Sequence, residues 1–457
     1  MLTSSILALL LALAPQESGG ARRVNSVCDL SQEFTFYMDG RFHAQYLKDV
    51  GRDARNWGSL ARLELANVNL LVLTGGDAHV PYSDESVARV EQYVKDGGTL
   101  LLMADGGEFV PPGARLAERF GAKLTAVSAK KPLAPSDASW KVEFRAGRVL
   151  DVGEPWRVLV RDAESRPVLA TRDFGRGSVI LGSRGLFGHQ PDAKDPINAA
   201  WVTPLLVEHA ARKRIDAAKP HESTWAEHTR EIGPLTLEYT DGTARFADAI
   251  AGEYALVRPH LVALTGVEPA QGMIKRLLIL PTGGGGFSSG ERIAIAAWWG
   301  GYPEQRYPML ELISHEAGHS WVLPHPEPLW NEPIATYLGI QVGRRLGMPE
   351  AERTLREQIA AAKKLDPEFT ERDPLAADAP RDLVWGKFYF VFEELERRHG
   401  PGALAKYFQK KRELVARDRK SYSMDDCVAV WSRAVDADLF PWFRSLAFPV
   451  DAARSDL

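Results

Sequence analysis

Two histidines and a glutamate stand at a spacing that can bind a metal ion and do chemistry beside it. They are His315, Glu316 and His319, within the heptapeptide SHEAGHS at 314–320. Residues i and i+4 share one face of an α-helix, so both imidazoles can bind the same cation. Glu316 would lie next to that cation, where a carboxylate can take a proton from an activated water. The motif therefore predicts metal-assisted hydrolysis, if a helix presents it and a third ligand completes it.

The residues around the motif predict that helix. Pro308 suits its first turn, because the missing N–H would have no intrahelical partner there. The apolar residues that follow have the spacing of one helix face: Met309, Leu312, Ile313 and Ala317. Pro324 and Pro326 predict its end. Gly318 costs about 1 kcal/mol relative to Ala in a helix, and we interpret it as a position of close packing.

A catalytic zinc site commonly has three protein ligands and one open position, and two residues are candidates for the third ligand. Glu332 follows Asn331, which can cap a second helix, and precedes Pro333, which suits that helix's first turn. Glu332 would then project back toward the first helix. His325 is the alternative, because H-E-x-x-H-x-x-x-x-x-H is the metzincin histidine spacing. In that pattern a turn-forming glycine stands where this chain has Val322.

Together these residues resemble a known family. The motif HEAGH at 315–319, followed by Trp330-Asn331-Glu332 and Ala335, is similar to the gluzincin zinc peptidases, especially the aminopeptidase-N-like branch. The resemblance covers roughly residues 233–445. It implies an α+β, thermolysin-like catalytic domain with one zinc ion bound by His315, His319 and Glu332. It also implies Glu316 as general base and a peptide or protein as substrate.

A glycine-rich stretch precedes the motif, TGGGGFSSG at 282–290, between predicted strands at 277–280 and 293–296. In the resembled family such an edge segment lines the substrate cleft, because open backbone groups can pair with an extended peptide. This implies substrate-binding roles for Gly284, Gly285 and Gly286. The aminopeptidases carry an acidic residue in this segment and this chain does not, so endo- and exo-action both stay open.

Two further departures concern the spacing and a tyrosine. The gap between His319 and Glu332 is shorter than is usual for that branch. The family also has a tyrosine that stabilises the tetrahedral intermediate, and alignment on Gly386 places Leu383 there. Tyr389 is the candidate substitute. It also belongs to an i, i+3, i+4, i+7 stripe that is typical of a helix core: Trp385, Phe388, Tyr389 and Phe392.

Residues 27–214 predict a separate α/β domain. Apolar strands at 68–73 and 99–103 flank a helix at 84–95, and this succession predicts a mainly parallel sheet. A hairpin is predicted at 174–182. The pattern resembles class I glutamine-amidotransferase-like domains, including the ThuA-like type. Their nucleophilic cysteine is absent from the matching turn at 103–107, so we predict a non-catalytic domain with a binding or scaffolding role.

The remaining chain divides into a predicted signal peptide, a linker and helices. The apolar run at 2–14 is too short for a relaxed membrane span. We therefore predict a signal peptide at 1–22, export to the periplasm or the exterior, and no stable membrane span after cleavage. A polar linker is predicted at 215–232, a catalytic region at 233–342 and a helical region at 343–457. Its helices are expected at 350–364, 383–398, 403–416 and 423–435.

Composition narrows the function classes. The formal net charge is −4, so the chain has no excess of basic residues. We therefore predict no nucleic-acid partner. With two cysteines, Cys28 and Cys427, we do not expect disulfides to be the source of stability. We predict an exported zinc peptidase. The alternatives are a non-catalytic zinc-containing binding module for an envelope or glycan partner, and a metzincin-like peptidase that uses His325. The sequence predicts no particular oligomeric state.

Overall fold

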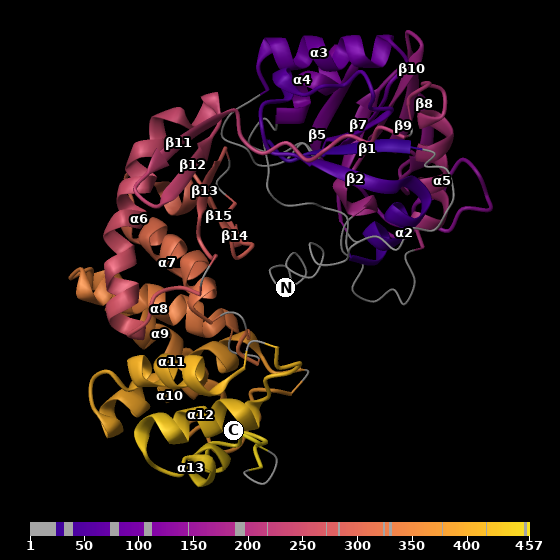
Figure 1. The fold of residues 1–457 in the computed structure, drawn as a ribbon. Coiled ribbons are helices and arrows are strands. Elements are labelled where there is room, and N and C mark those ends of the chain that lie inside the picture. The colour runs from indigo at the N-terminus through magenta and orange to yellow at the C-terminus, as the bar shows by residue number, and fades with distance from the viewer. Residues whose placement is uncertain are drawn as a thin grey trace.

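The chain forms an α/β amino-terminal half, a second sheet with its own helices, and a helical carboxyl-terminal region (Figure 1). The computed structural model describes residues 24–31, 40–73, 82–104, 112–144, 146–187, 197–216, 218–270, 272–281, 284–322, 325–328, 331–376, 378–416, 418–451 and 455–457. The signal peptide predicted at 1–22 lies outside these residues, as does most of the turn at 103–107.

The amino-terminal half is built on an eight-stranded sheet in the order β2-β1-β3-β4-β10-β9-β8-β6. Strands β2, β1, β3, β4 and β10 run parallel, and β10 pairs antiparallel with β9. This confirms the predicted parallel sheet and the predicted hairpin. The strands are β1 (Val24–Asp29), β2 (Gly51–Asn56), β3 (Leu70–Leu73), β4 (Thr99–Met103), β6 (Ala134–Pro135), β8 (Arg157–Arg161), β9 (Pro167–Phe174) and β10 (Gly177–Gly182). A separate two-stranded sheet pairs β5 (Ala122–Ser128) with β7 (Arg148–Val152).

Helices cover both faces of this sheet, which explains why its central strands are continuous apolar runs. Alternate residues of β3 and β4 enter two different cores. One core includes α2 (Gly40–Val50) and α5 (Ala199–Ala210). The other includes α3 (Asp84–Lys95) and α4 (Pro112–Arg119). The predicted helix at 84–95 is found with those bounds, and the Ser83 side chain caps it by accepting from the Ser86 N–H.

The second sheet has five strands in the order β11-β12-β13-β15-β14. They are β11 (His228–Ile232), β12 (Leu235–Tyr239), β13 (Arg276–Leu280), β14 (Gly286–Ser288) and β15 (Arg292–Ala296). One face packs on α6 (Ala244–Thr265) and α7 (Arg306–Val322). The predicted linker at 215–232 thus ends in a strand. Sequence patterning missed β11 because three of its five side chains are exposed, which leaves no apolar alternation.

Helices make up the chain from α8 onward: α8 (Asn331–Arg345), α9 (Pro349–Leu365), α10 (Arg381–His399), α11 (Ala403–Leu414), α12 (Met424–Val435) and α13 (Phe440–Ser445). The four predicted carboxyl-terminal helices are confirmed. Single 3-10 turns occur at η1 (Leu60–Arg62), η2 (Arg184–Leu186), η3 (Asp241–Thr243) and η4 (Trp299–Gly301). None of the helices in the described ranges is long and apolar enough to cross a membrane.

Small residues allow α7 and α8 to approach closely. Ala335, Gly339 and Gly343 recur every four residues along α8 and so form one ridge. A methyl group at Gly339 would lie 2.9 Å from the Glu311 carbonyl oxygen on α7. From the other side, a methyl group at Gly318 would lie 3.4 Å from the Ala335 Cα. The close packing that we interpreted for Gly318 is therefore present, and its partner is the second helix of the motif.

The close approach predicts opposite effects for two Gly-to-Ala changes. Gly339→Ala forces a methyl group against backbone and should lower the free energy of unfolding by about 1–3 kcal/mol. Gly252→Ala, on the exposed side of α6 with nothing within 4 Å of the added methyl, should raise it by up to about 1 kcal/mol. Urea unfolding of both variants measures the difference, and equal effects would contradict the packing described here.

Candidate functional site

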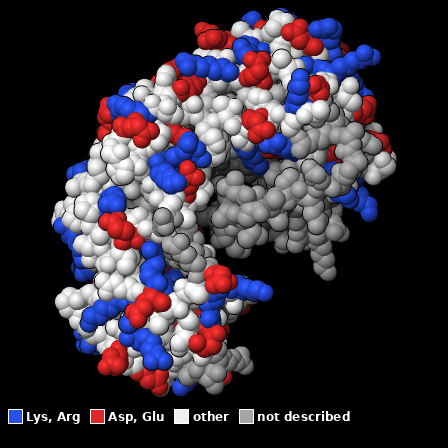
Figure 2. Space-filling view, viewed as in Figure 1, with Lys and Arg blue, Asp and Glu red and all other residues white. Residues whose placement is uncertain are grey.

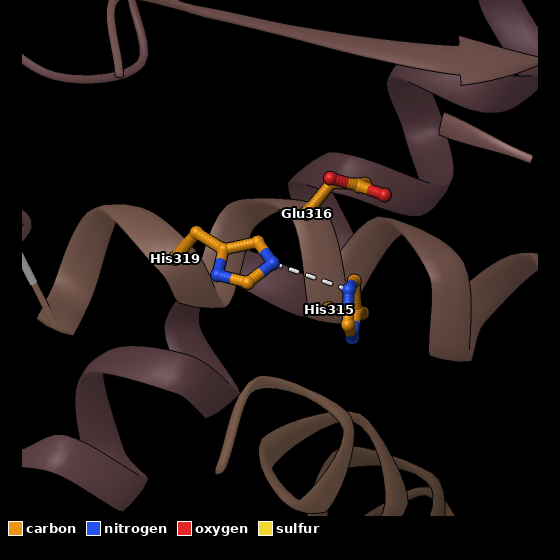
Figure 3. Close-up of side chains that lie close together, drawn as sticks. All are labelled: His315, Glu316 and His319. Atoms are coloured by element: carbon orange, nitrogen blue, oxygen red, sulfur yellow. Dashed lines mark hydrogen bonds between the residues drawn. The ribbon is translucent and has the colours of Figure 1, made fainter. Parts of the chain in front are cut away.

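The two motif histidines lie side by side on α7, with their Nε2 atoms 3.2 Å apart (Figure 3). The helix begins at Arg306, places Pro308 in its first turn and ends at Val322. The predicted helix is thus confirmed, and it presents both imidazoles on one face. Figure 3 also shows Glu316 beside them on the same helix. The possible ligand atoms of these three residues all lie within 4.8 Å of one another.

Glu332 comes from α8 and completes the group. It is the second residue of that helix, and its Oε2 lies 3.3 Å from His315 Nε2. Its Oε1 lies 3.7 Å from His319 Nε2. Zinc bonds of about 2.0–2.1 Å at tetrahedral angles would separate ligand atoms by about 3.3 Å. Two imidazole nitrogens and the Glu332 carboxylate, with one oxygen toward each nitrogen, therefore lie close together, and these are donor types that zinc accepts.

His325, the alternative third ligand, lies apart from this group. Its Nε2 bonds to the Ala416 carbonyl oxygen at 2.8 Å, beyond the end of α11. Its ring packs near the ring of Tyr422. Its own carbonyl oxygen accepts from Lys411 Nζ on α11 at 2.7 Å, so both ends of the residue are held on the α11 side. The structure consequently does not fit the metzincin-like arrangement that we kept as an alternative.

Burial and neighbouring charges set the protonation of the site. Glu316 is only 6% exposed, and burial raises its pKa to about 7, with a smaller raising effect from the Glu332 charge and an opposing one from His315. Burial also lowers the pKa of His319 to about 3. Burial opposes charge on His315 as well, yet its bond to Glu332 and the nearby carboxylates raise its pKa. The Glu332 carboxylate thus favours positive charge at the position of His315 Nε2.

The far nitrogens of both imidazoles have partners on α8. His315 Nδ1 lies 2.8 Å from the Thr336 hydroxyl. His319 Nδ1 lies 3.2 Å from the Asn331 side-chain amide, whose oxygen is buried without a partner among the described residues. Turning that amide over would let its oxygen accept the Nδ1–H, and such flips are assigned from the hydrogen-bond network. The far nitrogen of each imidazole therefore has a polar partner on α8, as is usual for histidines that bind a metal through the other nitrogen.

Tyr389 lies behind the site rather than in it. Its side chain is 1% exposed and contacts the Thr336 hydroxyl on the side of His315 that faces away from Glu332. Burial raises the pKa of this phenol well above its usual value. The predicted role in stabilising a tetrahedral intermediate does not suit this position. Tyr389 contacts and supports Thr336. Its surroundings agree better with a core position in the apolar stripe of its helix than with a catalytic role.

The glycine-rich stretch contributes β14, the last strand of the described sheet, next to Glu316. A methyl group at Gly286 would lie 3.0 Å from the Glu316 Cγ and 2.5 Å from the Ala294 carbonyl oxygen. Gly285 has a φ of +109°, a value that favours glycine. Gly284 precedes it, just before the strand begins. Glycine at 286 therefore lets the edge strand lie directly against the predicted general base.

A buried ion pair supports the loop between α7 and α8. Lys411 on α11 pairs with Glu327, and their side chains are 5% and 0% exposed. Lys411 Nζ also donates to the carbonyl oxygens of Val322 and His325, at 3.1 and 2.7 Å. Glu327 additionally accepts from the Tyr407 hydroxyl at 2.7 Å. This network fixes the end of α7 and the chain that leads toward Glu332.

Sequence reasoning missed the supporting residues for different reasons. Thr336 could have been found, because it stands four residues after Glu332 and so shares its helix face. Lys411 could not, because it lies 84 positions from Glu327 and only the tertiary fold brings the two together. Another group, Glu227, His228 and Asp241, also gathers possible ligand atoms. Glu227 accepts backbone N–H groups of Ser59 and Asp241 there, which is a structural role.

Comparisons with known proteins do not assign a function to this chain. No family model and no curated protein matches the sequence. The IFT52 N-terminal domain aligns over 42% of this chain and 99% of its own length, at 15% identity and a TM-score of 0.35. A cytoplasmic protein from Salmonella typhimurium aligns over 37% of this chain and 85% of its own, at 13% identity and 0.29. An exo-beta-1,4-mannosidase from an Opitutaceae bacterium aligns over 42% of this chain and 36% of its own length, at 15% identity and a TM-score of 0.28. Scores this low support no inference about function.

Removing the Thr336 hydroxyl should weaken metal binding. Thr336→Val keeps the shape of the side chain but leaves His315 Nδ1 without its partner, so zinc affinity should fall about 10–100-fold. Thr336→Ser retains the hydroxyl and should stay within about threefold of the wild type. Competition with a chromophoric chelator measures both affinities. Equal affinities for the Val and Ser variants would show that this hydroxyl does not orient His315.

Breaking the buried ion pair should destabilise the protein. Lys411→Met leaves Glu327 buried without its cation, so the free energy of unfolding should fall by about 3–5 kcal/mol. The neighbouring Lys410→Met changes a partly exposed pair with Glu413 and should have an effect below about 1 kcal/mol. Urea unfolding compares the two variants. Similar losses in both would contradict the role assigned to Lys411.

Proposed function

We propose that this chain is a zinc-dependent peptidase, with His315, His319 and Glu332 as zinc ligands and Glu316 as general base. The observation that supports this most strongly is the convergence of three side chains from two helices. The two imidazole Nε2 atoms lie 3.2 Å apart, Glu332 Oε2 lies 3.3 Å from His315 Nε2, and Glu332 Oε1 lies 3.7 Å from His319 Nε2. The Glu316 carboxylate stands beside the histidines in a buried position. We further propose that residues 233–342 form a thermolysin-like gluzincin domain, and that the protein is exported.

Glu316 has the position and the proton affinity for acid–base work. A bound zinc ion would lower the pKa of its water ligand to about 7 and polarise the scissile carbonyl. Glu316 accepts the water's proton and later delivers it to the leaving amine nitrogen, so the same carboxylate ends each cycle as it began. Burial keeps its pKa near 7, where a carboxyl can both take and release a proton.

The edge strand β14 suits an extended peptide. The Ala296 N–H donates to the Gly285 oxygen, and the Ser289 N–H donates to the Arg292 oxygen, both at 2.8 Å. In an antiparallel ladder the bonded positions alternate, so Gly286 and Ser288 direct their N–H and C=O groups away from β15. No described strand pairs with that side. A substrate backbone that added there would lie beside Glu316, which supports a peptide substrate over a small ester or amide.

Glu316→Gln should abolish most of the peptide cleavage without affecting metal binding. The amide cannot accept the proton, so the rate of peptide cleavage should fall at least about 100-fold while zinc stays bound. The assay uses a mixed peptide library with the purified chain, and a chelator must abolish cleavage as well. His325→Ala serves as a matched control that should keep both zinc and activity.

The outcomes of this assay discriminate between the functions considered. Cleavage that Glu316→Gln and the chelator both remove supports the peptidase, and the fragment ends distinguish endo- from exo-action. Bound zinc without cleavage of any peptide in the library would favour the non-catalytic binding module. Loss of zinc in His325→Ala would overturn the ligand set.

A further inference from the structure

Apolar residues of the second sheet, on the face turned away from α6 and α7, share a buried cluster with the amino-terminal domain. Leu278, Leu280, Phe287 and Ala294 belong to the same buried core as residues of β1, β3 and β4. In Figure 1 α6 and α7 lie on one side of the second sheet, and the amino-terminal half lies beyond its other side. Apolar contacts therefore cross the predicted domain boundary.

Trp57 forms the centre of that interface. It is 5% exposed and follows β2 of the amino-terminal sheet. Its ring centroid lies 5.2 Å from that of Phe287 on β14 and 5.3 Å from that of Trp225, on which it stacks in parallel. The Arg292 guanidinium of β15 covers Trp225 at 3.6 Å. Aromatic pairs of this kind stabilise beyond the area they bury.

Backbone bonds fix Trp57 relative to the second sheet. Its N–H donates to the Thr224 oxygen at 2.7 Å, and the Thr224 N–H donates to the Arg55 oxygen at 2.9 Å. Two positions further on, the Ser59 N–H donates to Glu227, whose other oxygen accepts from the chain after β12. These bonds join the segment before β11 to the end of β2 and hold Trp57 beside Trp225.

β14 therefore lies between the amino-terminal domain and the candidate active site. Successive side chains of a strand point to opposite faces. Gly286 faces Glu316, because a methyl group added to it would lie 3.0 Å from the Glu316 Cγ, while Phe287 faces Trp57. With three residues and one described partner strand, β14 depends on packing for its position.

We propose that Trp57 is a positioning residue, through which the amino-terminal domain holds β14 in place for binding of the substrate backbone beside Glu316. That Trp57 holds β14 in place does not depend on the chemistry at the site. The consequence for substrate binding rests on the proposed peptidase function. The amidotransferase-like half would then be a required part of the active site rather than a separate module.

The test compares Trp57→Ala with Trp156→Ala in the full chain. Trp156 is buried to a similar extent, at 7% exposed, in the same domain, but packs in the core that contains α3 and α4 and donates to the Phe120 oxygen. Both variants lose a large buried ring, so general destabilisation is matched. Hydrogen exchange of the segment 284–290, zinc affinity, and the KM and kcat for a cleaved peptide are measured for each.

Trp57→Ala should speed exchange at 284–290 by about tenfold and raise KM by about tenfold, with zinc affinity within about threefold of the wild type. Trp156→Ala should change none of these. Trp57→Phe, which keeps a ring against Phe287, should restore most of the loss. Should Trp57→Ala fail to fold, Phe287→Leu, which keeps apolar bulk without the ring pair, provides the same comparison.

Exchange at 284–290 that is equal in the Trp57 and Trp156 variants would overturn the proposal. Faster exchange with an unchanged KM would confine Trp57 to supporting the fold and would overturn its role in substrate binding. If no peptide is cleaved by the wild type, the peptidase function fails, and the exchange and zinc measurements still decide whether the domain holds β14.

Discussion

The close contact between α7 and α8 is the constraint on which the site depends. Two of the proposed ligands come from α7 and the third from α8, and ligand atoms must come within about 3.3 Å of one another to share a zinc ion. Side chains of ordinary size between the helices would separate them. The small residues Ala335, Gly339 and Gly343 remove that obstacle, and Gly318 does the same from α7. The glycines lower the helix propensity of both segments, and the close approach requires them nonetheless.

Buried charge is the second constraint. The carboxylates of Glu316, Glu332 and Glu311 all act on His315, and burial raises the pKa of Glu316 and of Glu311. Isolated buried carboxylates are costly, so such a group requires protons, hydrogen bonds or a cation. Glu332 has His315 as its partner, and this contact raises the pKa of His315. On the face of the molecule shown in Figure 2, Lys and Arg intermingle with Asp and Glu.

The sequence allowed the parts of the fold with strong local signals to be predicted. Pro308 indicated the first turn of α7, and i, i+4 spacing places His315 and His319 on one face. Continuous apolar runs identified β3 and β4 as buried parallel strands. β11 was missed because its side chains are mostly exposed, and apolar periodicity arises only where one face of a strand is buried.

Contacts between distant segments could not be predicted. The pairing of Lys411 with Glu327 and the packing of Trp57 on Phe287 leave no periodic signal in the chain. Tyr389 illustrates the reverse problem. Its residue type suggested chemistry, whereas the position behind Thr336 could be known only from the packing of α10 against α8. Thr336 itself could have been identified, since it follows Glu332 by one helical turn.

Zinc-edge X-ray absorption of the metal-loaded chain, combined with anomalous diffraction, would test the central claim most directly. The account predicts one zinc ion bound by two imidazole nitrogens and one carboxylate oxygen at about 2.0–2.2 Å, located between α7 and α8. A zinc ion bound by three imidazoles including His325, or one bound instead at Glu227, His228 and Asp241, would contradict it.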